Sequence, residues 1–277
     1  MRKYNLNSIF FSPAYTTAAV TNYIAEGLAS CAAGEEAAEH DLSAPGWAGG
    51  EIRFNADDLA IFGAPVYSGR IPALAAERFR AFRGADTPAI VAVVYGNRAY
   101  EDALLELKDL AEAQGFIVVG AAAFVAQHCM LPEVALGRPD IDDKAKAIEF
   151  GQKCAWKLVN IDQVQNNAQA GDAPENPAGQ TLEVPGNRPY REVAPGPAPR
   201  PIADDGCTRC QACVENCPVK AIPADDPRTT GEACFACCRC ITICPVKARK
   251  LPEPVQARLE QFLGSLRNVR HEAEFYL

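Results

Sequence analysis

Between residues 5 and 160, short apolar runs alternate with amphipathic stretches. The apolar runs predict strands at 7–12, 37–42, 59–63, 89–95 and 116–124. Residues 90–94 are apolar without alternation, as expected of a parallel strand that is covered on both faces. In the stretches 100–114 and 141–155, apolar residues recur at helical spacing, which predicts helices there.

Five strands that alternate with helices predict an α/β fold over residues 1–161, a doubly wound parallel five-stranded sheet of flavodoxin type. Ligands of such sheets bind where the carboxyl ends of strands meet the amino ends of helices. Residues 162–203 lose this periodicity and are rich in proline and glycine, so we expect a linker. The end of this linker, residues 194–201, is expected to be extended and semi-rigid. The alternative is that the linker wraps along one domain as ordered coil. A small α+β domain (204–252) and a C-terminal helix and tail (253–277) complete the prediction.

The chain has 277 residues, a net charge of -8 and 48% hydrophobic residues. It contains no apolar run near the ~18 residues of a membrane span and no apparent secretory signal, so we expect a cytoplasmic protein. The negative charge disfavours nucleic-acid binding and is compatible with a basic redox partner or simply with solubility. Neither the substrate nor the oligomeric state can be read from the sequence, and a homo-oligomer is one possibility.

Nine of the twelve cysteines fall between residues 207 and 244, in two four-cysteine runs that each end in Cys-Pro. Each cysteine of the first run recurs 27 residues later in the second, which indicates an internal duplication. Three thiolates on one tight loop can occupy three corners of a cubane, and in two-cluster ferredoxins the fourth comes from the other run. The prediction is therefore two [4Fe-4S] clusters, one held by Cys207, Cys210, Cys213 and Cys244, the other by Cys234, Cys237, Cys240 and Cys217.

Zinc binding is the main alternative for these runs, and a disulfide framework is disfavoured because nothing indicates an oxidising compartment. Cys238 interrupts the repeat, since its counterpart is Gln211. We expect Cys238 to be a small residue packed beside a cluster rather than a ligand.

A hydroxyl-rich turn follows the first expected strand and leads into a helix. Its residues Ser12, Thr16 and Thr17 favour either phosphate binding, as in FMN, or simple capping of the helix. The third and fourth strands each end near a Tyr and a Gly, where a ring can stack on a flavin. The candidate contacts in these two loops are Pro65, Val66, Tyr67, Gly69, Arg70, Tyr95, Gly96, Asn97, Arg98 and Tyr100.

Together, residues 10–13, 65–70 and 94–100 and the paired cysteine runs resemble the bacterial and archaeal family of flavodoxin/ferredoxin fusion oxidoreductases. The resemblance implies FMN in the first domain, two [4Fe-4S] clusters in the second and electron transfer between them. Ala14 and Tyr15 depart from the pattern Ser/Thr-x-Thr-Gly-x-Thr of flavodoxin-like phosphate loops. A bulky residue in place of that glycine predicts a strained or reshaped turn, with Tyr15 covering the site.

The leading hypothesis is a flavo-iron-sulfur oxidoreductase that passes electrons between two [4Fe-4S] clusters and FMN, to or from a redox partner protein or a small substrate. The alternative is an electron carrier or assembly subunit whose flavodoxin-like domain has lost FMN and binds another protein. No dinucleotide fingerprint follows a strand, so direct use of NAD(P)H has no support. The three histidines share no ligand spacing and are expected to be surface or packing residues.

Overall fold

The computed structural model describes residues 2–32, 36–168, 182–193 and 196–277. Its main body is built on a sheet whose parallel strands are β1 (Asn5–Phe10), β2 (Ala38–Asp41), β4 (Asp58–Pro65), β6 (Thr87–Tyr95) and β7 (Phe116–Val125). These strands lie in the order β2-β1-β4-β6-β7. Counting only these five, the order is 2-1-3-4-5, which is the flavodoxin-like arrangement of doubly wound sheets. The predicted flavodoxin-like α/β fold is therefore confirmed.

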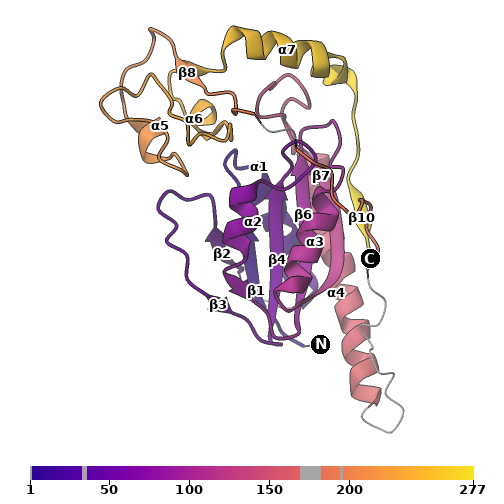
Figure 1. Cartoon of the computed structure of the whole chain (residues 1–277). Helices are drawn as coiled ribbons and strands as arrows, with labels where there is room; N and C mark the ends of the chain where they lie inside the picture. The colour runs from indigo at the N-terminus through magenta and orange to yellow at the C-terminus, as the bar shows by residue number, and fades with distance from the viewer. Residues whose placement is uncertain (1, 33–35, 169–181, 194–195) are drawn as a thin grey trace.

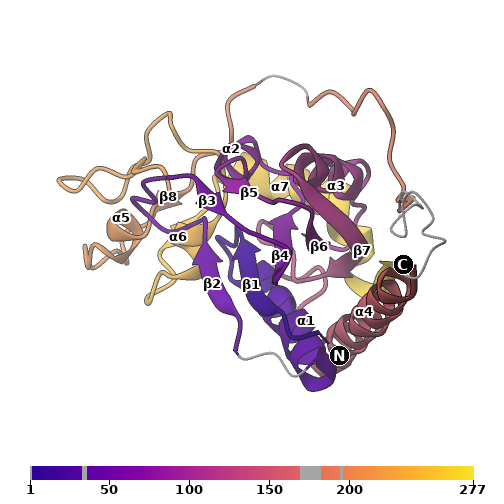
Figure 2. The same ribbon diagram turned by 90° about the horizontal axis from the view of Figure 1, so that it is seen from below.

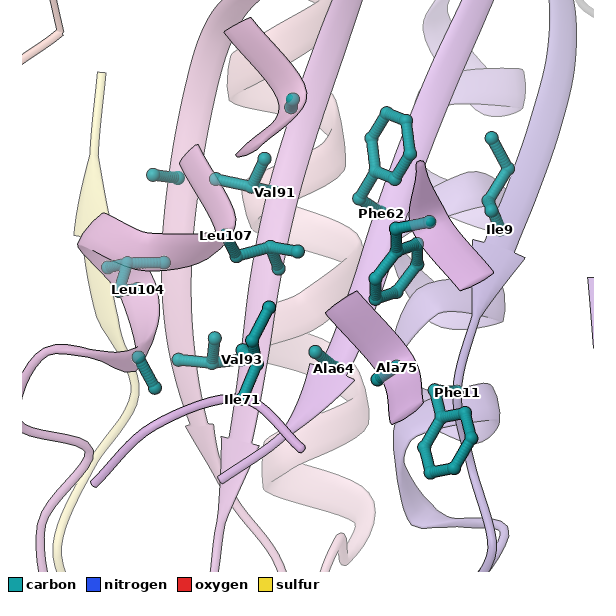
Figure 3. Packing of buried hydrophobic residues seen from close by; sticks show 14 of the residues in the cluster. Ile9, Phe11, Phe62, Ala64, Ile71, Ala75, Val91, Val93, Leu104 and Leu107 are labelled. Atoms are coloured by element: carbon teal, nitrogen blue, oxygen red, sulfur yellow. The ribbon is translucent and has the colours of Figure 1, made fainter. Parts of the chain in front are cut away.

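Helices cover both faces of the sheet (Figure 2), with α1 (Thr16–Ala32) and α4 (Ile141–Ala168) on one face and α2 (Ala73–Phe79) and α3 (Ala103–Ala113) on the other. Each face of the sheet carries its own hydrophobic core under its pair of helices. Side chains of β6 alternate between these two cores, because successive residues of a strand point to opposite faces. Val91 and Val93 pack with Leu104 and Leu107 of α3 (Figure 3). Their neighbours Ile90, Ala92 and Val94 belong to the core under α1 and α4.

The two helices on the first face approach each other closely at glycine. A Cβ atom on Gly27 of α1 would lie 2.1 Å from the carbonyl oxygen of Ile148 in α4. No side chain fits at that distance, so the contact between these helices requires glycine.

The described sheet has six strands, so the predicted number of five is wrong. The sixth is β10 (Glu274–Tyr276), which pairs antiparallel with the edge of β7. Three residues are too few to give a period-2 signal, and the edge of β7 offers unpaired backbone groups. A second short pair, β3 (Ile52–Arg53) with β5 (Phe82–Arg83), escaped prediction for the same reason.

Helix α4 continues to Ala168, so it includes the first residues of the segment expected to be a linker. Residues 169–181 and 194–195 of that segment lie outside the described residues. Residues 182–193 run along α3 as coil, where Asn187 N donates to Asp102 Oδ1 at 2.8 Å and Tyr190 Oη donates to Asp109 Oδ2 at 2.6 Å. This part of the segment therefore corresponds to the ordered-coil alternative.

Residues 202–250, here called the cysteine module, lie beyond the carboxyl ends of the sheet strands, and α7 (Glu253–Leu263) crosses the same end (Figure 1). The module contains β8 (Ile202–Ala203) paired antiparallel with β9 (Arg249–Lys250), and the short helices α5 (Ala212–Glu215) and α6 (Arg239–Thr242). After α7 the chain passes through the 3₁₀ helix η1 (Gly264–Asn268) and returns to the sheet as β10.

The duplication seen in the sequence is also present in the backbone of the cysteine module. Positive φ angles recur 27 residues apart, at 54° and 57° for Arg209 and Ala236 and at 64° and 61° for Gln211 and Cys238. The two halves therefore share a loop conformation as well as a cysteine spacing. In the described part of the chain, no helix has the length and apolar character needed to cross a membrane.

Candidate functional site

The loop between β1 and α1 forms the first part of the site. Ser12 is buried, and its Oγ accepts a hydrogen bond from Ala18 N at 3.0 Å, so this hydroxyl caps α1. Thr17 is 1% exposed, whereas Thr16 is partly exposed at the helix start. The amino end of α1 directs its remaining N–H groups and its dipole to the end of the sheet, where an anion is favoured.

Tyr15 holds the position where phosphate loops of this type carry glycine. Its φ angle is 67°, in the left-handed region that is costly for a bulky residue, so the predicted strain is confirmed. Tyr15 is 46% exposed, and its ring centroid lies 5.1 Å from the guanidinium carbon of Arg239 in the cysteine module. Arg239 Nη1 also donates to Ser43 Oγ at 2.9 Å. The side chain that replaces glycine thus contributes to the contact between the body and the module.

A narrow cavity of about 50 Å³ lies at the carboxyl ends of the strands, lined by Thr17, Val66, Gly96 and His128 among others. It shares Val66, Tyr67, His128 and Cys129 with a wide cavity of about 970 Å³ between the body, α7 and the cysteine module. Cavities that bind small molecules are typically about 300–1,000 Å³ and mostly apolar. The wide cavity is of this size, and the narrow one continues it to the loop before α1.

His128, which the sequence suggested to be a surface or packing residue, lines both cavities. Its Nδ1 accepts hydrogen bonds from Met130 N and Leu131 N, each at 3.2 Å. Burial and then the nearby charge of Arg98 lower the pKa of His128 to about 4. The ring is therefore neutral at physiological pH, with its proton assigned to Nε2. The one sequence signal for His128 is its place just after the carboxyl end of β7.

Gly96 allows this histidine to approach the loop after β6. A Cβ atom on Gly96 would lie 2.3 Å from His128 Cδ2. Any side chain at this position would displace the imidazole, so the loop and the histidine fit together only with glycine.

Two predicted contact residues, Asn97 and Tyr100, bind the C-terminal tail and line neither the narrow nor the wide cavity. Asn97 is buried, and its Nδ2 donates to Val269 O at 2.7 Å while its Oδ1 accepts from His271 N at 3.2 Å. Tyr100 Oη donates to Glu274 Oε2 at 2.7 Å. Tyr95 lines the narrow cavity and packs on Tyr100, with ring centroids 5.4 Å apart. Asn97 and Tyr100 therefore secure the C-terminal tail against the sheet.

The two predicted arginines line the wide cavity with their charges already paired. Arg70 Nε and Nη2 donate to the two carboxylate oxygens of Glu106 at 2.6 and 2.7 Å. Arg98 pairs with Glu101 at 2.9 Å. Gly69 has a φ of 79°, and a Cβ atom there would collide with Glu101 Oε2, so Gly69 shapes the loop rather than the cavity wall. Pro65 lines the narrow cavity.

All twelve cysteines are free in the structure. Nine of them line two small cavities of the cysteine module, and without Cys238, which lines the inner cavity as well, they form two quartets. The outer quartet is Cys207, Cys210, Cys213 and Cys244. The inner quartet is Cys217, Cys234, Cys237 and Cys240. Each quartet combines three cysteines of one run with the last cysteine of the other, which is the predicted crossover.

Backbone amides and one arginine point to the sulfur atoms of these quartets. Ala221 N donates to Cys217 Sγ at 3.2 Å and Ala236 N to Cys234 Sγ at 3.4 Å. Arg249 is 2% exposed, and its Nη1 lies 3.7 Å from Cys213 Sγ. Donors of this kind stabilise negative charge on sulfur. In the described part of the chain, no three His, Cys, Asp or Glu side chains meet closely enough to hold one metal ion.

The inner quartet lies at the junction with the body. The Phe235 ring lies 6.1 Å from the Phe11 ring and 6.4 Å from the Tyr67 ring, between centroids. Tyr67 Oη donates to Cys237 O at 3.5 Å, and Arg78 Nη2 donates to Pro218 O at 3.2 Å. Phe235 also lines the wide cavity, so that cavity and the inner quartet share a wall.

No family model matches the chain, and no curated protein matches it. Among solved structures, flavodoxin 1 from Bacillus cereus has 17% identity and a TM-score of 0.41, over 56% of this chain and 97% of that protein. The Flv1 flavodiiron core from Synechocystis has 16% identity and a TM-score of 0.41, over 57% of this chain. Rubredoxin oxygen:oxidoreductase from Desulfovibrio gigas has 12% identity and a TM-score of 0.39, over 58%. The chain spans 37% of the length of each of the last two proteins.

Proposed function

We propose that this chain is an oxidoreductase that binds FMN in the flavodoxin-like body and one [4Fe-4S] cluster in each quartet, and that exchanges electrons between them. The observation that carries the proposal is the grouping of eight free cysteines into two quartets by crossover. Thiolates in sets of four are the ligands of such clusters, and the exchange of the last cysteine between runs is their two-cluster arrangement.

The residues of the cluster sites fit this cofactor in charge as well as in number. Two cubanes held by eight thiolates would place negative charge in the module. The backbone N–H groups of Ala221 and Ala236 and the guanidinium of Arg249 point to the cysteine sulfurs and would stabilise that charge. Burial raises the pKa of Cys237 to about 12 and that of Cys240 to about 11. Cluster binding at these positions therefore includes release of the thiol protons.

The two connected cavities support FMN as the second cofactor. The narrow cavity beside the start of α1 suits a phosphate, which the backbone of Thr16 and Thr17 and the helix dipole favour. The wide cavity beside Tyr67 suits a flat aromatic ring, with Phe235 and Met130 as further apolar walls. FMN held there supplies exchange of one or two electrons.

The positions of the two quartets support a path for electrons from the surface of the cysteine module to the flavin site. Cys210 of the outer quartet is exposed, so a redox partner can approach there. The small cavity of the inner quartet and the wide cavity share Val219 and Phe235 in their linings, and the Tyr67 ring lies 6.4 Å from the Phe235 ring. We therefore assign the outer quartet to the partner side and the inner quartet to the flavin side.

Anaerobic purification followed by analysis of iron, sulfide and released flavin tests the proposal. We expect about eight iron and eight sulfide per chain and one FMN. Cys213→Ser and Cys240→Ser should each remove about half of the iron, whereas Cys31→Ser on α1 should leave it unchanged. Bound zinc without sulfide would overturn the cluster assignment. Full iron content without flavin would leave the electron-carrier alternative as the function.

A further inference from the structure

Arg249 is the most deeply buried cation of the cysteine module. It begins β9 and is 2% exposed. Its Nη2 donates to Pro201 O at 2.8 Å, and its Nη1 donates to Pro227 O at 2.5 Å. Nη2 also donates to Thr229 O at 3.3 Å and to Thr230 Oγ1. These acceptors are backbone carbonyls and a hydroxyl, and none of them is a carboxylate.

The positive charge of Arg249 is therefore not neutralised by the oxygen atoms that it binds. Burial of such a charge is costly unless a negative charge compensates it. Arg138 of the body shows the usual arrangement, since it is 5% exposed and its Nε donates to Oδ2 of the buried Asp143 at 2.8 Å. The Nε of Arg249, in contrast, is buried and has no hydrogen-bond partner among the described residues. Arg249 thus has both a charge without a carboxylate and an unused donor.

Arg249 contacts the surroundings of both quartets. It lines the cavity of the outer quartet, where its Nη1 lies 3.7 Å from Cys213 Sγ. Two of its acceptors, Pro201 and Thr230, line the cavity of the inner quartet. One buried positive charge is therefore bonded to the walls of both cavities.

The identity of residue 249 departs from the internal duplication. Its counterpart 27 residues earlier is Ile222, a buried residue that lines the cavity of the inner quartet. Arg239 is also buried and lines the inner cavity, but its guanidinium binds the body, because Nη1 donates to Ser43 O and Oγ and the group lies over the Tyr15 ring. Of these three residues, Arg249 alone combines a buried charge with bonds to the walls of both cavities.

We propose that Arg249 is a counter-charge shared by both [4Fe-4S] clusters and that it raises the reduction potential of each. The inference rests on the proposed function. Reduction of a cluster adds one negative charge, and a buried, weakly screened cation stabilises the reduced state more than the oxidised state. The negative charge of the clusters would in return compensate the charge of Arg249, and the unused Nε is a donor available to the same sites.

Redox titration of the anaerobically purified full chain, followed by electron paramagnetic resonance, tests the inference. Arg249→Met and Arg249→Gln remove the charge, whereas Arg249→Lys keeps the charge and loses the planar fork of donors. We expect both neutral variants to shift the reduction equilibrium of each cluster about tenfold or more toward the oxidised state, which is a fall of about 59 mV for one electron. Arg249→Lys should titrate close to the unmodified chain.

Lys247→Met is the matched control, because it removes one positive charge from an exposed residue of the same module. Water and salt screen that charge, so the potentials should change little. Unchanged potentials in a neutral Arg249 variant with full iron and sulfide content would overturn the inference. An equal fall in the Lys247→Met chain would do the same, since the effect would then follow net charge alone.

The iron and sulfide content of each variant covers the case in which the neutral variants do not keep their clusters. Retention in Arg249→Lys with loss in Arg249→Met and Arg249→Gln would support a need for the charge. Loss in all three variants would overturn the inference, because the geometry of the hydrogen bonds would then be decisive. Absence of iron and sulfide from the unmodified chain would instead overturn the proposed function, and this inference with it.

Discussion

The guanidinium carbon of Arg239 lies 5.1 Å from the centre of the Tyr15 ring, and this contact joins the cysteine module to the loop before α1. Tyr15 has a positive φ, so the body accepts backbone strain at the residue that makes the contact. In the sequence, Arg239 lies between Cys237 and Cys240 of the inner quartet. One strained residue therefore connects the candidate phosphate site with a candidate cluster site.

The strain and the ring contact can be separated by two substitutions. Tyr15→Ala removes the ring but keeps a side chain at positive φ, whereas Tyr15→Gly removes the ring and relaxes the backbone. We expect Tyr15→Gly to be more stable than Tyr15→Ala by about 1 kcal/mol in denaturant unfolding. Equal stability of the two variants would show that the turn is not strained.

Arg78 is expected to secure the same junction from α2. It is 9% exposed, and its guanidinium donates to Leu42 O at 2.5 Å and to Pro218 O at 3.2 Å. Arg78→Met leaves these buried carbonyls without their donor and should cost about 2–4 kcal/mol. Hydrogen exchange should also increase in the cysteine module.

Arg80→Met is the control for this prediction, because Arg80 ends the same helix and is exposed. It should change stability by less than about 0.5 kcal/mol. Similar losses in the two variants would contradict a specific role of Arg78 at the junction.

Asn97 is expected to hold the C-terminal tail on the sheet. Asn97→Gly keeps the positive φ of 61° without strain and removes the hydrogen bonds to Val269 and His271. We expect a loss of about 2–3 kcal/mol and faster hydrogen exchange in residues 269–277. Asp86→Gly makes the same change at an exposed residue with a φ of 54° and should leave exchange in the tail unchanged.

The lowered pKa of His128 leads us to expect that the stability of the fold depends on pH. Its pKa is about 4 in the folded chain, lowered by burial and then by Arg98, and about 6.5 when unfolded. Between these values the unfolded chain binds the proton and the folded chain does not, so stability falls as pH decreases from 6.5 to 4. This histidine alone should account for about 3 kcal/mol over that window.

His128→Asn provides the comparison, because its side-chain oxygen can accept from Met130 N and it does not titrate. Unfolding free energies of both proteins at several pH values should diverge over this window, with the unmodified chain losing more. Parallel curves would mean that His128 is protonated equally in the folded and unfolded chains.

Hydrophobic periodicity and cysteine spacing along the sequence were enough to predict the central strands and the grouping of the cysteines. Residues 90–94 are apolar without interruption, which is enough to identify a central strand, because a strand buried on both faces has no polar side. The cysteine runs determined which four sulfurs group together, since three on one loop leave the fourth to the other run. Tyr15 was recognised as a strained residue from its place in a loop pattern alone.

Other features depend on contacts between segments that are distant in sequence, and no local pattern encodes them. The tail joins the sheet because Asn97 and Tyr100 bind it, so two residues predicted as flavin contacts have their main contacts there. His128 faces the cavities because β7 ends beside Gly96. Phe235 meets Phe11 and Tyr67 only because the cysteine module packs over the carboxyl ends of the strands. The sequence by itself determined the five parallel strands and the grouping of the cysteines, and the packing of the module on the body decided which side chains share a site.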